Sequence, residues 1–389
     1  DTVGIFANSS PFWLIFDFAI LQVGAISVPI FANISSENLN FEIKDSAMKY
    51  MFIDSQERLK DIEKENSHLT FITHNFCIKE PNFYNFDEIL VIGKQICDST
   101  GFTSFEANPD DVFSIIYTSG NTGTPKGVML SHKNIVTQLH DINKLIDLPK
   151  DEVALSLLPL AHIFERTVMS YYLSRGISIY FVDDVLNVAN LMKVVKPTIM
   201  TVVPRLLEKI FNKIKAQILE KPFFSRVIAS LAFSYALKEN LDKSSILFKI
   251  YDKLVYSKFR EIFGSKVEKL VSGGAPLSKE IAIFFVNIDV PVYQGYGMTE
   301  FSPVVSTNYP FANKVGSCGK VIPSAQIKIT ANNELLVRGD SLMLGYLNQE
   351  ELTKNTIDSD GWLHTGDVAH LDEDGYLFIK SRIKDIFKT

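Results

Sequence analysis

Cysteine is scarce in this sequence, and basic residues are missing from its beginning. The 389 residues include only three cysteines, Cys77, Cys97 and Cys318, and none belongs to a C-x-x-C pair. A disulfide framework and a zinc site are therefore not indicated, and a reducing, cytoplasmic compartment fits best. No Lys or Arg precedes Lys44, so the basic segment that opens a secretory signal is missing.

Two classes of function are disfavoured by what the sequence lacks. The net charge is −6, with 39 Lys and Arg against 45 Asp and Glu, which argues against a general nucleic-acid binder. No G-x-S-x-G segment occurs, so a serine hydrolase with a nucleophile elbow has no candidate nucleophile. With 46% hydrophobic and 22% charged residues, the composition is that of a soluble globular enzyme.

One hydrophobic run, residues 12–31, has about the length of a bilayer span. Asp17, Gln22 and Pro29 interrupt the run, and a charge inside a membrane is costly. We therefore expect a buried helix, a turn at Gly24 and a strand here.

The chain is long enough for two or three packed subdomains. From about residue 110, short β-branched runs alternate with amphipathic stretches, which predicts parallel strands joined by crossover helices. After about Val315, short strands separated by turn residues predict a small β-rich subdomain. We expect an α/β fold with doubly wound, mostly parallel sheets in stacked αβαβα-type subdomains, at about residues 1–110 and 111–310, followed by the β subdomain at 315–383.

Residues 205–266 form a basic helical block, with 13 Lys or Arg against 6 Asp or Glu. Apolar side chains interleave with these charges. Such a block can lie on a membrane surface or against an acidic partner. The alternative is a solvated helical insertion that covers the core.

The strongest local signal is the segment YTSGNTGTPKG at residues 117–127, between an apolar strand and an expected helix. Its glycines let backbone N–H groups approach an anion, its hydroxyl side chains add donors, and Lys126 supplies a positive charge. It is not a Walker A loop, because Pro125 and Gly127 flank the lysine. The segment predicts a phosphate site, and a plain loop is the alternative.

Two further signals follow expected strands. The segments SGGAP at 272–276 and YQGYGMTE at 293–300 place small residues, an aromatic ring and a carboxylate at adjacent strand ends. Small residues opposite an aromatic ring can hold a flat nucleotide base, and Glu300 is a hard oxygen ligand suited to Mg²⁺ near phosphates. Asp367, in a Thr-Gly-Asp turn, can accept hydrogen bonds from a ribose. In isolation, each would be read as a core aromatic or a surface carboxylate.

In this order and combination, the three segments resemble those of the adenylate-forming superfamily, which comprises acyl-CoA synthetases, luciferases and peptide-synthetase adenylation domains. The resemblance implies catalytic roles for Lys126, Thr299 and Glu300, and a metal site at Thr118 and Glu300. It implies that the loop holds the ATP phosphates, Tyr296 stacks on adenine and Asp367 binds the ribose. The implied nucleotide contacts are Thr118, Ser119, Gly120, Asn121, Thr122, Gly123, Lys126, Gly274, Ala275, Pro276, Gln294, Gly295, Tyr296, Gly297, Met298, Thr299, Asp367, Ile379 and Arg382.

Two other segments, LPLAHIFER at 158–166 and VPRLLEK at 203–209, resemble the long-chain acyl-CoA synthetases within that superfamily. The resemblance implies an acyl tunnel bordered by His162 and Phe164. Arg166 stands where some bacterial relatives carry an aromatic tunnel gate, which argues against such a gate here. Asn121 replaces the Thr or Ser commonest in the phosphate loop, and its amide can still donate.

The resemblance also assigns the ends of the chain. Residues 1–383 correspond to the large AMP-binding domain and residues 384–389 to the start of a hinge at Lys384. The small C-terminal domain of relatives, with a lysine that contacts the substrate, would follow Thr389. No Met precedes Asp1, so we expect a fragment.

The implied reaction joins a long-chain fatty acid to ATP as an acyl-adenylate, and coenzyme A then displaces AMP. Fatty acid, ATP and coenzyme A are the expected substrates, and Mg²⁺ is the expected cofactor. Delivery of the acyl group to a carrier protein is one alternative, and a nucleotide-binding fragment without full turnover is another. The resemblance allows a homodimer, and the basic block allows contact with the inner face of a membrane.

Overall fold

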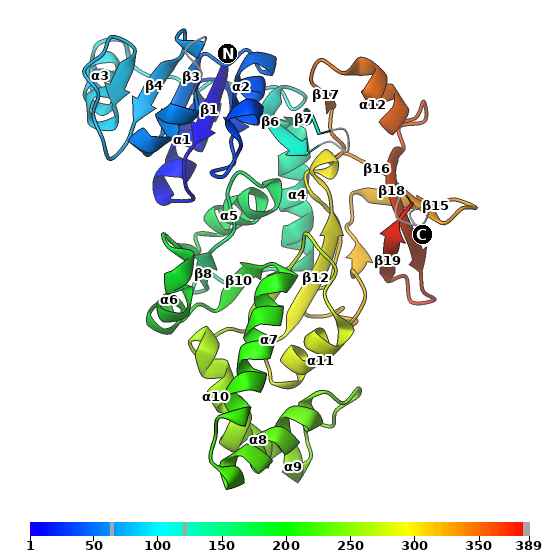
Figure 1. Ribbon diagram of the computed structural model, residues 1–389. Helices are drawn as coiled ribbons and strands as arrows, with labels where there is room; N and C mark the ends of the chain where they lie inside the picture. The colour runs from blue at the N-terminus through cyan, green and yellow to red at the C-terminus, as the bar shows by residue number, and fades with distance from the viewer. Residues whose placement is uncertain (63–65, 120–122, 384–389) are drawn as a thin grey trace.

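Three β-sheets organise the part of the chain that the structure describes, with helices packed around the two larger ones (Figure 1). The computed structural model describes residues 1–62, 66–119 and 123–383. The α-helices are α1 (Pro11–Gln22), α2 (Ser36–Asp45), α3 (Phe86–Thr100), α4 (His132–Leu145), α5 (Ile163–Arg175), α6 (Val188–Val195), α7 (Pro204–Leu219), α8 (Phe223–Ala236), α9 (Ile246–Tyr251), α10 (Ser257–Arg260), α11 (Lys279–Asn287) and α12 (Glu350–Thr356).

The first sheet is parallel except at one edge. Its strands, in spatial order, are β17 (Gly345–Tyr346), β7 (Pro125–Ser131), β6 (Val112–Ser119), β2 (Ile26–Pro29), β1 (Thr2–Phe6), β3 (Tyr50–Ile53), β4 (Thr70–Thr73) and β5 (Phe83–Asn85). Among the strand pairs formed by described residues of this sheet, only β6–β7 and β7–β17 are antiparallel.

The second sheet has the same mixed character. Its order is β14 (Lys320–Val321), β13 (Val304–Thr307), β12 (Val292–Gly297), β11 (Lys269–Ser272), β10 (Ile199–Val202), β8 (Val153–Ser156) and β9 (Ser178–Phe181). The five strands from β12 to β9 are parallel, so the predicted α/β fold with mostly parallel sheets is confirmed.

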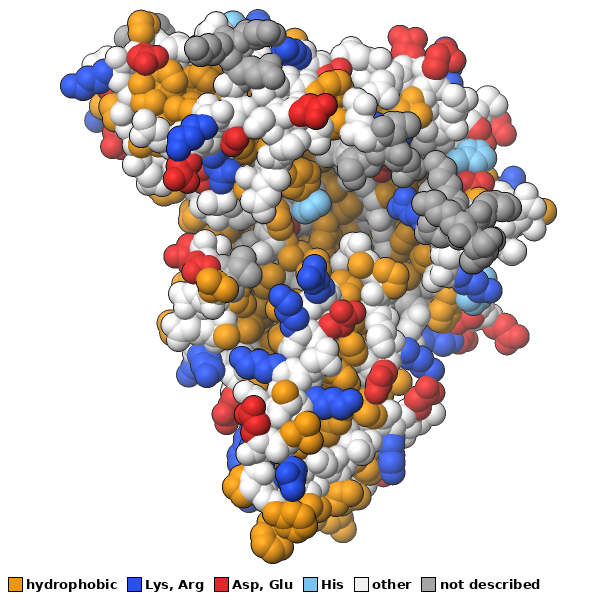
Figure 2. All heavy atoms as spheres, viewed as in Figure 1, with side chains coloured by type: hydrophobic (Ala, Val, Ile, Leu, Met, Phe, Trp, Pro, Cys, Tyr) orange, Lys and Arg blue, Asp and Glu red, His pale blue; other side chains and the backbone are white. Residues whose placement is uncertain are grey.

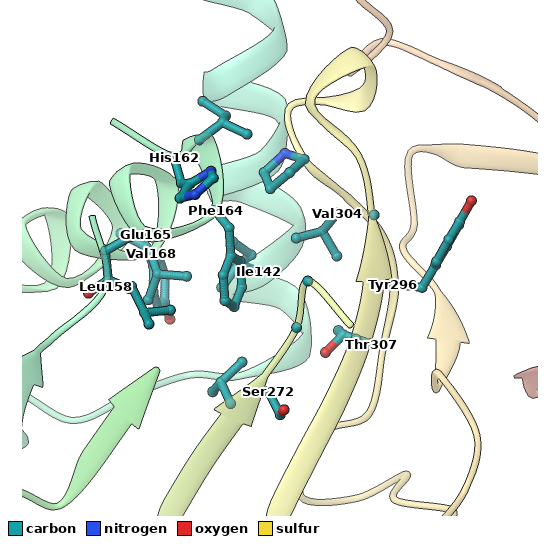
Figure 3. Close-up of a pocket in the computed structure, with 18 of the residues that line it drawn as sticks. Ile142, Leu158, His162, Phe164, Glu165, Val168, Ser272, Tyr296, Val304 and Thr307 are labelled. Atoms are coloured by element: carbon teal, nitrogen blue, oxygen red, sulfur yellow. The ribbon is translucent and has the colours of Figure 1, made fainter. Parts of the chain in front are cut away.

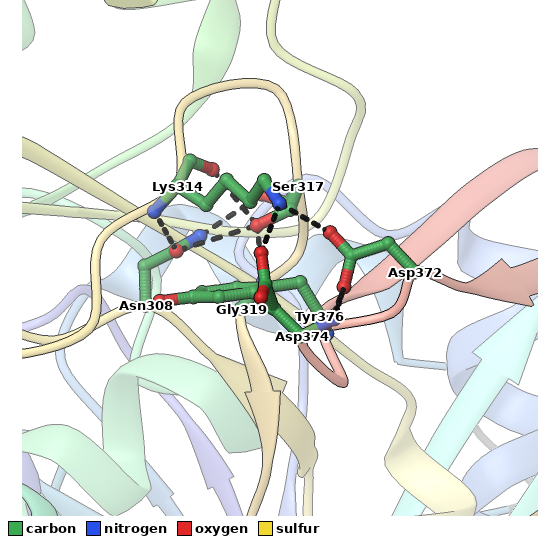
Figure 4. Close-up of polar contacts among 7 residues, drawn as sticks. All are labelled: Asn308, Lys314, Ser317, Gly319, Asp372, Asp374 and Tyr376. Atoms are coloured by element: carbon green, nitrogen blue, oxygen red, sulfur yellow. Dashed lines mark hydrogen bonds and ion pairs between the residues drawn. The ribbon is translucent and has the colours of Figure 1, made fainter.

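The third sheet is small and antiparallel, as the turn-rich sequence predicts. It consists of β15 (Ala325–Ile329), β16 (Glu334–Gly339), β18 (Leu363–Leu371) and β19 (Leu377–Arg382). Lys314, in the segment after β13, ties the β18–β19 turn to the second sheet: its ammonium reaches Asp372 at 2.6 Å and Asp374 at 2.9 Å (Figure 4). The backbone N–H of Cys318 also donates to the carbonyl of Leu377 at 2.7 Å.

Two features of the predicted organisation are wrong. Residues 125–131 form β7, a strand that the sequence pattern does not predict and that folds back on β6. The apolar side chains of β7 are buried in this hairpin, and α4 begins only after Ser131, which caps it. The change from the first sheet to the second therefore falls after Ser131 and not near residue 110.

The hydrophobic run of residues 12–31 forms the predicted helix, turn and strand. The hydroxyl of Ser10 accepts from the backbone of Trp13 at the start of α1, and Gly24 turns the chain with a φ of +73°. β2 follows as a buried strand. No helix among the described residues is long and apolar enough to cross a membrane.

The basic block is helical, as predicted. One side of α7 and α8 is buried with α11, and Phe211, Phe233 and Phe284 pack there with ring centroids about 5 Å apart. The charged side chains stay on the outside, as expected for an amphipathic arrangement.

A buried ion pair connects the first sheet to α5. The guanidinium of Arg166 donates to both carboxylate oxygens of Asp17, at 2.7 and 2.6 Å, and both side chains are about 2% exposed. Ser27 donates to the same carboxylate, and Ser114 accepts a third guanidinium hydrogen bond. The ring centroid of Phe113 lies 4.7 Å from the guanidinium carbon of Arg166. Hydrogen bonds thus compensate the desolvation of both charges.

Replacing one partner of this pair would leave the other charge buried and unpaired. We expect Asp17→Asn to lower the free energy of unfolding by about 3–5 kcal/mol, measured by urea denaturation. The control is Glu239→Gln, which breaks an ion pair with Lys279 whose side chains are 61% and 57% exposed and should cost below about 1 kcal/mol. Equal effects of the two substitutions would contradict a structural role for the buried pair.

Candidate nucleotide and acyl site

The predicted phosphate loop closes the β6–β7 hairpin. Thr118 pairs with Lys126 across the ladder, so the two side chains lie on one face of the sheet at the base of the loop. Ser119 ends β6, and Gly123 has a positive φ of 87° at the other end of the loop. Gly120, Asn121 and Thr122, and the predicted hinge residue Lys384, lie outside the described residues.

The two glycine-rich turns lie side by side because β11 and β12 are parallel neighbours. Residues 273–276 follow β11, and Gly274, Ala275 and Pro276 are exposed there. Gln294 to Gly297 end β12, followed by Met298 and Thr299. A side chain at Gly297 would lie 2.0 Å from the carbonyl oxygen of Pro303, so the close approach of these segments requires glycine.

The third sheet brings two predicted ribose contacts to Tyr296. The tyrosine hydroxyl donates to Asp367 Oδ2 at 2.5 Å, and Arg382 Nε lies 3.2 Å from Asp367 Oδ1. Burial, followed by the neighbouring carboxylate, raises the pKa of Tyr296 far above its usual range, so the hydroxyl remains a donor. The predicted contact Ile379 pairs with Ala369 in the same hairpin and packs against the third sheet's core.

Lys126 and Glu300 are joined by a residue that the sequence reasoning missed, Tyr346. Its hydroxyl donates to Glu300 Oε1 at 2.8 Å, and the Lys126 ammonium lies 5.3 Å from its ring centroid. No sequence signal marks this contact, because Tyr346 follows Glu300 by 46 residues and sits on a two-residue strand.

The residues around Glu300 fit a magnesium ion that is held jointly with phosphates. No group of three or more His, Cys, Asp or Glu within the described ranges could hold a metal by itself. Mg²⁺ is commonly bound by one or two carboxylates together with substrate phosphates, so a single carboxylate near a phosphate loop is a suitable donor set. Thr118, at the base of that loop, offers a hydroxyl oxygen.

An apolar cavity of about 580 Å³ reaches the glycine-rich turns (Figure 3). Residues 273–275 and 295–299 line one part of it, and mainly apolar side chains of α4, α5, β10, β11 and the segment before α5 line most of the rest. The lining residues of α5 extend from Ile163 to Tyr172, which is about 14 Å at the helical rise per residue. The volume lies within the usual range of small-molecule sites.

The predicted acyl contacts His162 and Phe164 both line this cavity. Burial lowers the pKa of His162, so the imidazole is neutral near pH 7, and it packs 4.4 Å from the Phe31 ring. Phe164 covers Gly273, where a side chain would approach its ring to 3.3 Å. Arg166 is not among the lining residues, because its side chain points into the pair with Asp17.

Glu165 is the one carboxyl group among the described residues that line the cavity, and it is fully buried. The hydroxyl of Ser156 donates to it at 2.6 Å, and Thr201 donates to its other oxygen. Desolvation raises the pKa of Glu165 to about 7 despite these hydrogen bonds. The group is satisfied internally, which leaves the cavity surface mainly apolar.

Comparison with curated proteins identifies relatives along the whole chain. The chain is 33% identical to the long-chain-fatty-acid–CoA ligase ACSBG2 of Xenopus laevis. The alignment covers 100% of this chain and 56% of that protein. It is 31% identical to the long-chain-fatty-acid–CoA ligase FadD15 of Mycobacterium bovis, and that alignment covers 100% of this chain and 66% of FadD15. The chain thus spans little more than half to two thirds of these relatives.

Solved structures share the fold. The N-terminal domain of FACL13 from Mycobacterium tuberculosis superimposes with a TM-score of 0.71 at 20% identity, covering 98% of this chain and 86% of that one. ATP-bound MatB from Rhodopseudomonas palustris gives a TM-score of 0.75 at 22% identity, covering 99% and 69%. The sequence profile of one family, described as AMP-binding enzyme, matches residues 1–347. Because this match extends over most of the chain, the chain belongs to the AMP-binding enzyme family.

Proposed function

We propose that this chain forms the nucleotide- and acyl-binding part of an ATP-dependent long-chain fatty-acid–CoA ligase. The observation that carries the proposal is the continuous cavity, whose lining passes from apolar side chains of α5 to the turns that carry Gly274 and Tyr296. One space of this kind can hold an alkyl chain and bring its carboxylate to a nucleotide.

In the proposed first step, a carboxylate oxygen of the fatty acid forms a bond to the α-phosphorus of ATP, and the bond to pyrophosphate breaks. Lys126 offsets negative charge on the departing pyrophosphate, and backbone donors of the glycine-rich turns orient the nucleotide. A magnesium ion at Glu300 supplies further charge neutralisation when bound. Positioning and electrostatics suffice, because the reaction needs no covalent enzyme intermediate.

The apolar lining supports a long alkyl chain as the second substrate. Burial contributes about 0.8 kcal/mol per methylene, so affinity grows with chain length until the cavity is filled. In the proposed second step, the thiol of coenzyme A attacks the acyl carbonyl and AMP leaves. Transfer of the acyl group to the thiol of a carrier protein is the alternative second step.

Asp367 tests the nucleotide site. Loss of its charge should remove charge-assisted hydrogen bonds worth about 1.5–3 kcal/mol, so Asp367→Asn should weaken ATP binding about 10- to 100-fold in calorimetric titrations. Glu373→Gln is the control, because Glu373 is exposed in the turn of the same hairpin. Similar affinities for both variants would argue against the ribose assignment.

Val168 tests the acyl site, because it lines the cavity from the middle of α5. Val168→Phe should fill space and weaken binding of a stearoyl-adenylate analogue, while an octanoyl analogue binds as before. Excluding two methylenes costs about tenfold in affinity. Val194→Phe, at a side chain that is 71% exposed on α6, is the control. A loss that is equal for both chain lengths would contradict an acyl cavity at this place.

We also propose that the basic helical block contacts an anionic membrane surface. Its far tip exposes large apolar side chains from α8 and α9, including Phe224 at 82% and Ile246 at 78% (Figure 2). Lys221 is exposed next to α8, and Arg226 lies 5.9 Å from the Phe223 ring. Apolar tips ringed by Lys and Arg are typical of helices that lie in a membrane interface.

Vesicle flotation checks this membrane contact. The chain should float with phosphatidylglycerol-containing vesicles at low salt, and the double substitution Phe223→Ser and Phe224→Ser should abolish most of that binding. Phe311→Ser is the control, since Phe311 is 94% exposed elsewhere on the molecule. Failure of the unsubstituted chain to float with anionic vesicles would remove the proposal.

A further inference from the structure

Tyr346 joins two predicted catalytic residues that belong to different parts of the fold. Lys126 lies on β7 of the first sheet, and Glu300 lies in the turn Thr299–Phe301 after β12 of the second. The hydroxyl of Tyr346 donates to Glu300 Oε1 at 2.8 Å, while its ring lies 5.3 Å from the Lys126 ammonium. One side chain therefore contacts both groups, through different atoms.

The position of Tyr346 is fixed independently of those two contacts. β17 pairs with β7, with Tyr346 opposite Val128, so its backbone is part of the first sheet. The backbone N–H of Tyr346 donates to Thr353 Oγ1 of α12 at 2.9 Å. The side chain is 5% exposed. A buried aromatic held at several points is well suited to orient a neighbour.

The hydrogen bond to Glu300 acts on one of its two carboxylate oxygens. A carboxylate oxygen can only accept a hydrogen bond, so the Tyr346 hydroxyl is the donor in this contact. Among the hydrogen bonds between described residues, none reaches Glu300 Oε2. The arrangement therefore fixes the carboxylate through Oε1 and leaves Oε2 for a cation.

We propose that Tyr346 is a positioning residue for the divalent cation of the reaction, and that it acts by orienting the Glu300 carboxylate beside Lys126. The inference rests on the proposed function, because it takes Glu300 as the carboxylate that binds Mg²⁺. Hydrogen-bond partners of metal-binding carboxylates commonly change metal affinity 10- to 100-fold when they are removed.

The test measures ATP binding by calorimetry at graded Mg²⁺ concentrations, and Mn²⁺ binding in the presence of ATP by electron paramagnetic resonance. Tyr346→Phe keeps the ring under Lys126 and removes only the hydroxyl. We expect about tenfold weaker apparent metal affinity, with metal-free ATP affinity within about twofold of the unsubstituted chain. Tyr346→Leu removes the ring as well and should also weaken metal-free ATP binding, because Lys126 loses its contact.

The control is Tyr256→Phe, which removes a buried hydroxyl that donates to the Ala232 carbonyl at 2.8 Å within the helical block. Its metal affinity should stay unchanged. Glu300→Gln should weaken metal binding by itself, and Tyr346→Phe should add little in that background, since both act through one carboxylate.

The outcomes separate the two proposals. If Glu300→Gln weakens metal binding and Tyr346→Phe does not, the role of Tyr346 is overturned and the proposed function stands. Full additivity of the two substitutions would also overturn it. If the unsubstituted chain binds neither ATP nor Mn²⁺ with ATP, both proposals fail.

Discussion

The buried pair between Asp17 and Arg166 connects the architecture to the site. Asp17 is on α1, Arg166 is on α5, and Ser27 and Ser114 of the first sheet complete the hydrogen bonds. An unpaired charge in this position would be costly, so the helices can pack only where the carboxylate meets the guanidinium. Because α5 also carries Phe164 and Val168, this constraint fixes the wall of the cavity relative to the first sheet.

Around that anchor, the parallel topology brings distant segments together. The carboxyl ends of parallel strands share one edge of a sheet, and β11 and β12 therefore present their glycine-rich turns side by side. The third sheet adds Asp367 and Arg382, held near Tyr296, and its link through Lys314 keeps the β18–β19 hairpin against the second sheet. Later in the chain, the two-residue strand β17 pairs with β7 of the first sheet, which places Tyr346 between Lys126 and Glu300. Each of the three sheets thus supplies part of one candidate site.

The helical block has two faces with different environments. Side chains such as Phe211 and Ile214 are buried against the second sheet, while Phe224 and Ile246 are exposed at the tip. Fatty acids partition into membranes, so a surface contact at this tip would keep the proposed enzyme close to its substrate. The charge of the block, basic inside an acidic chain, supports an anionic partner.

The sequence by itself determined the fold class and the positions of three glycine-rich segments at the ends of β6, β11 and β12, because periodicity and glycine placement are local properties of the chain. It also pointed to His162 and Phe164, which line one cavity. It missed β7, because no distinctive sequence pattern marks the antiparallel pairing of this segment with β6 and β17. Only the tertiary structure decided that Arg166 is paired with Asp17 and that Tyr346 meets Glu300. These contacts join residues 149 and 46 positions apart, and spacing along a chain carries no information about packing over such distances.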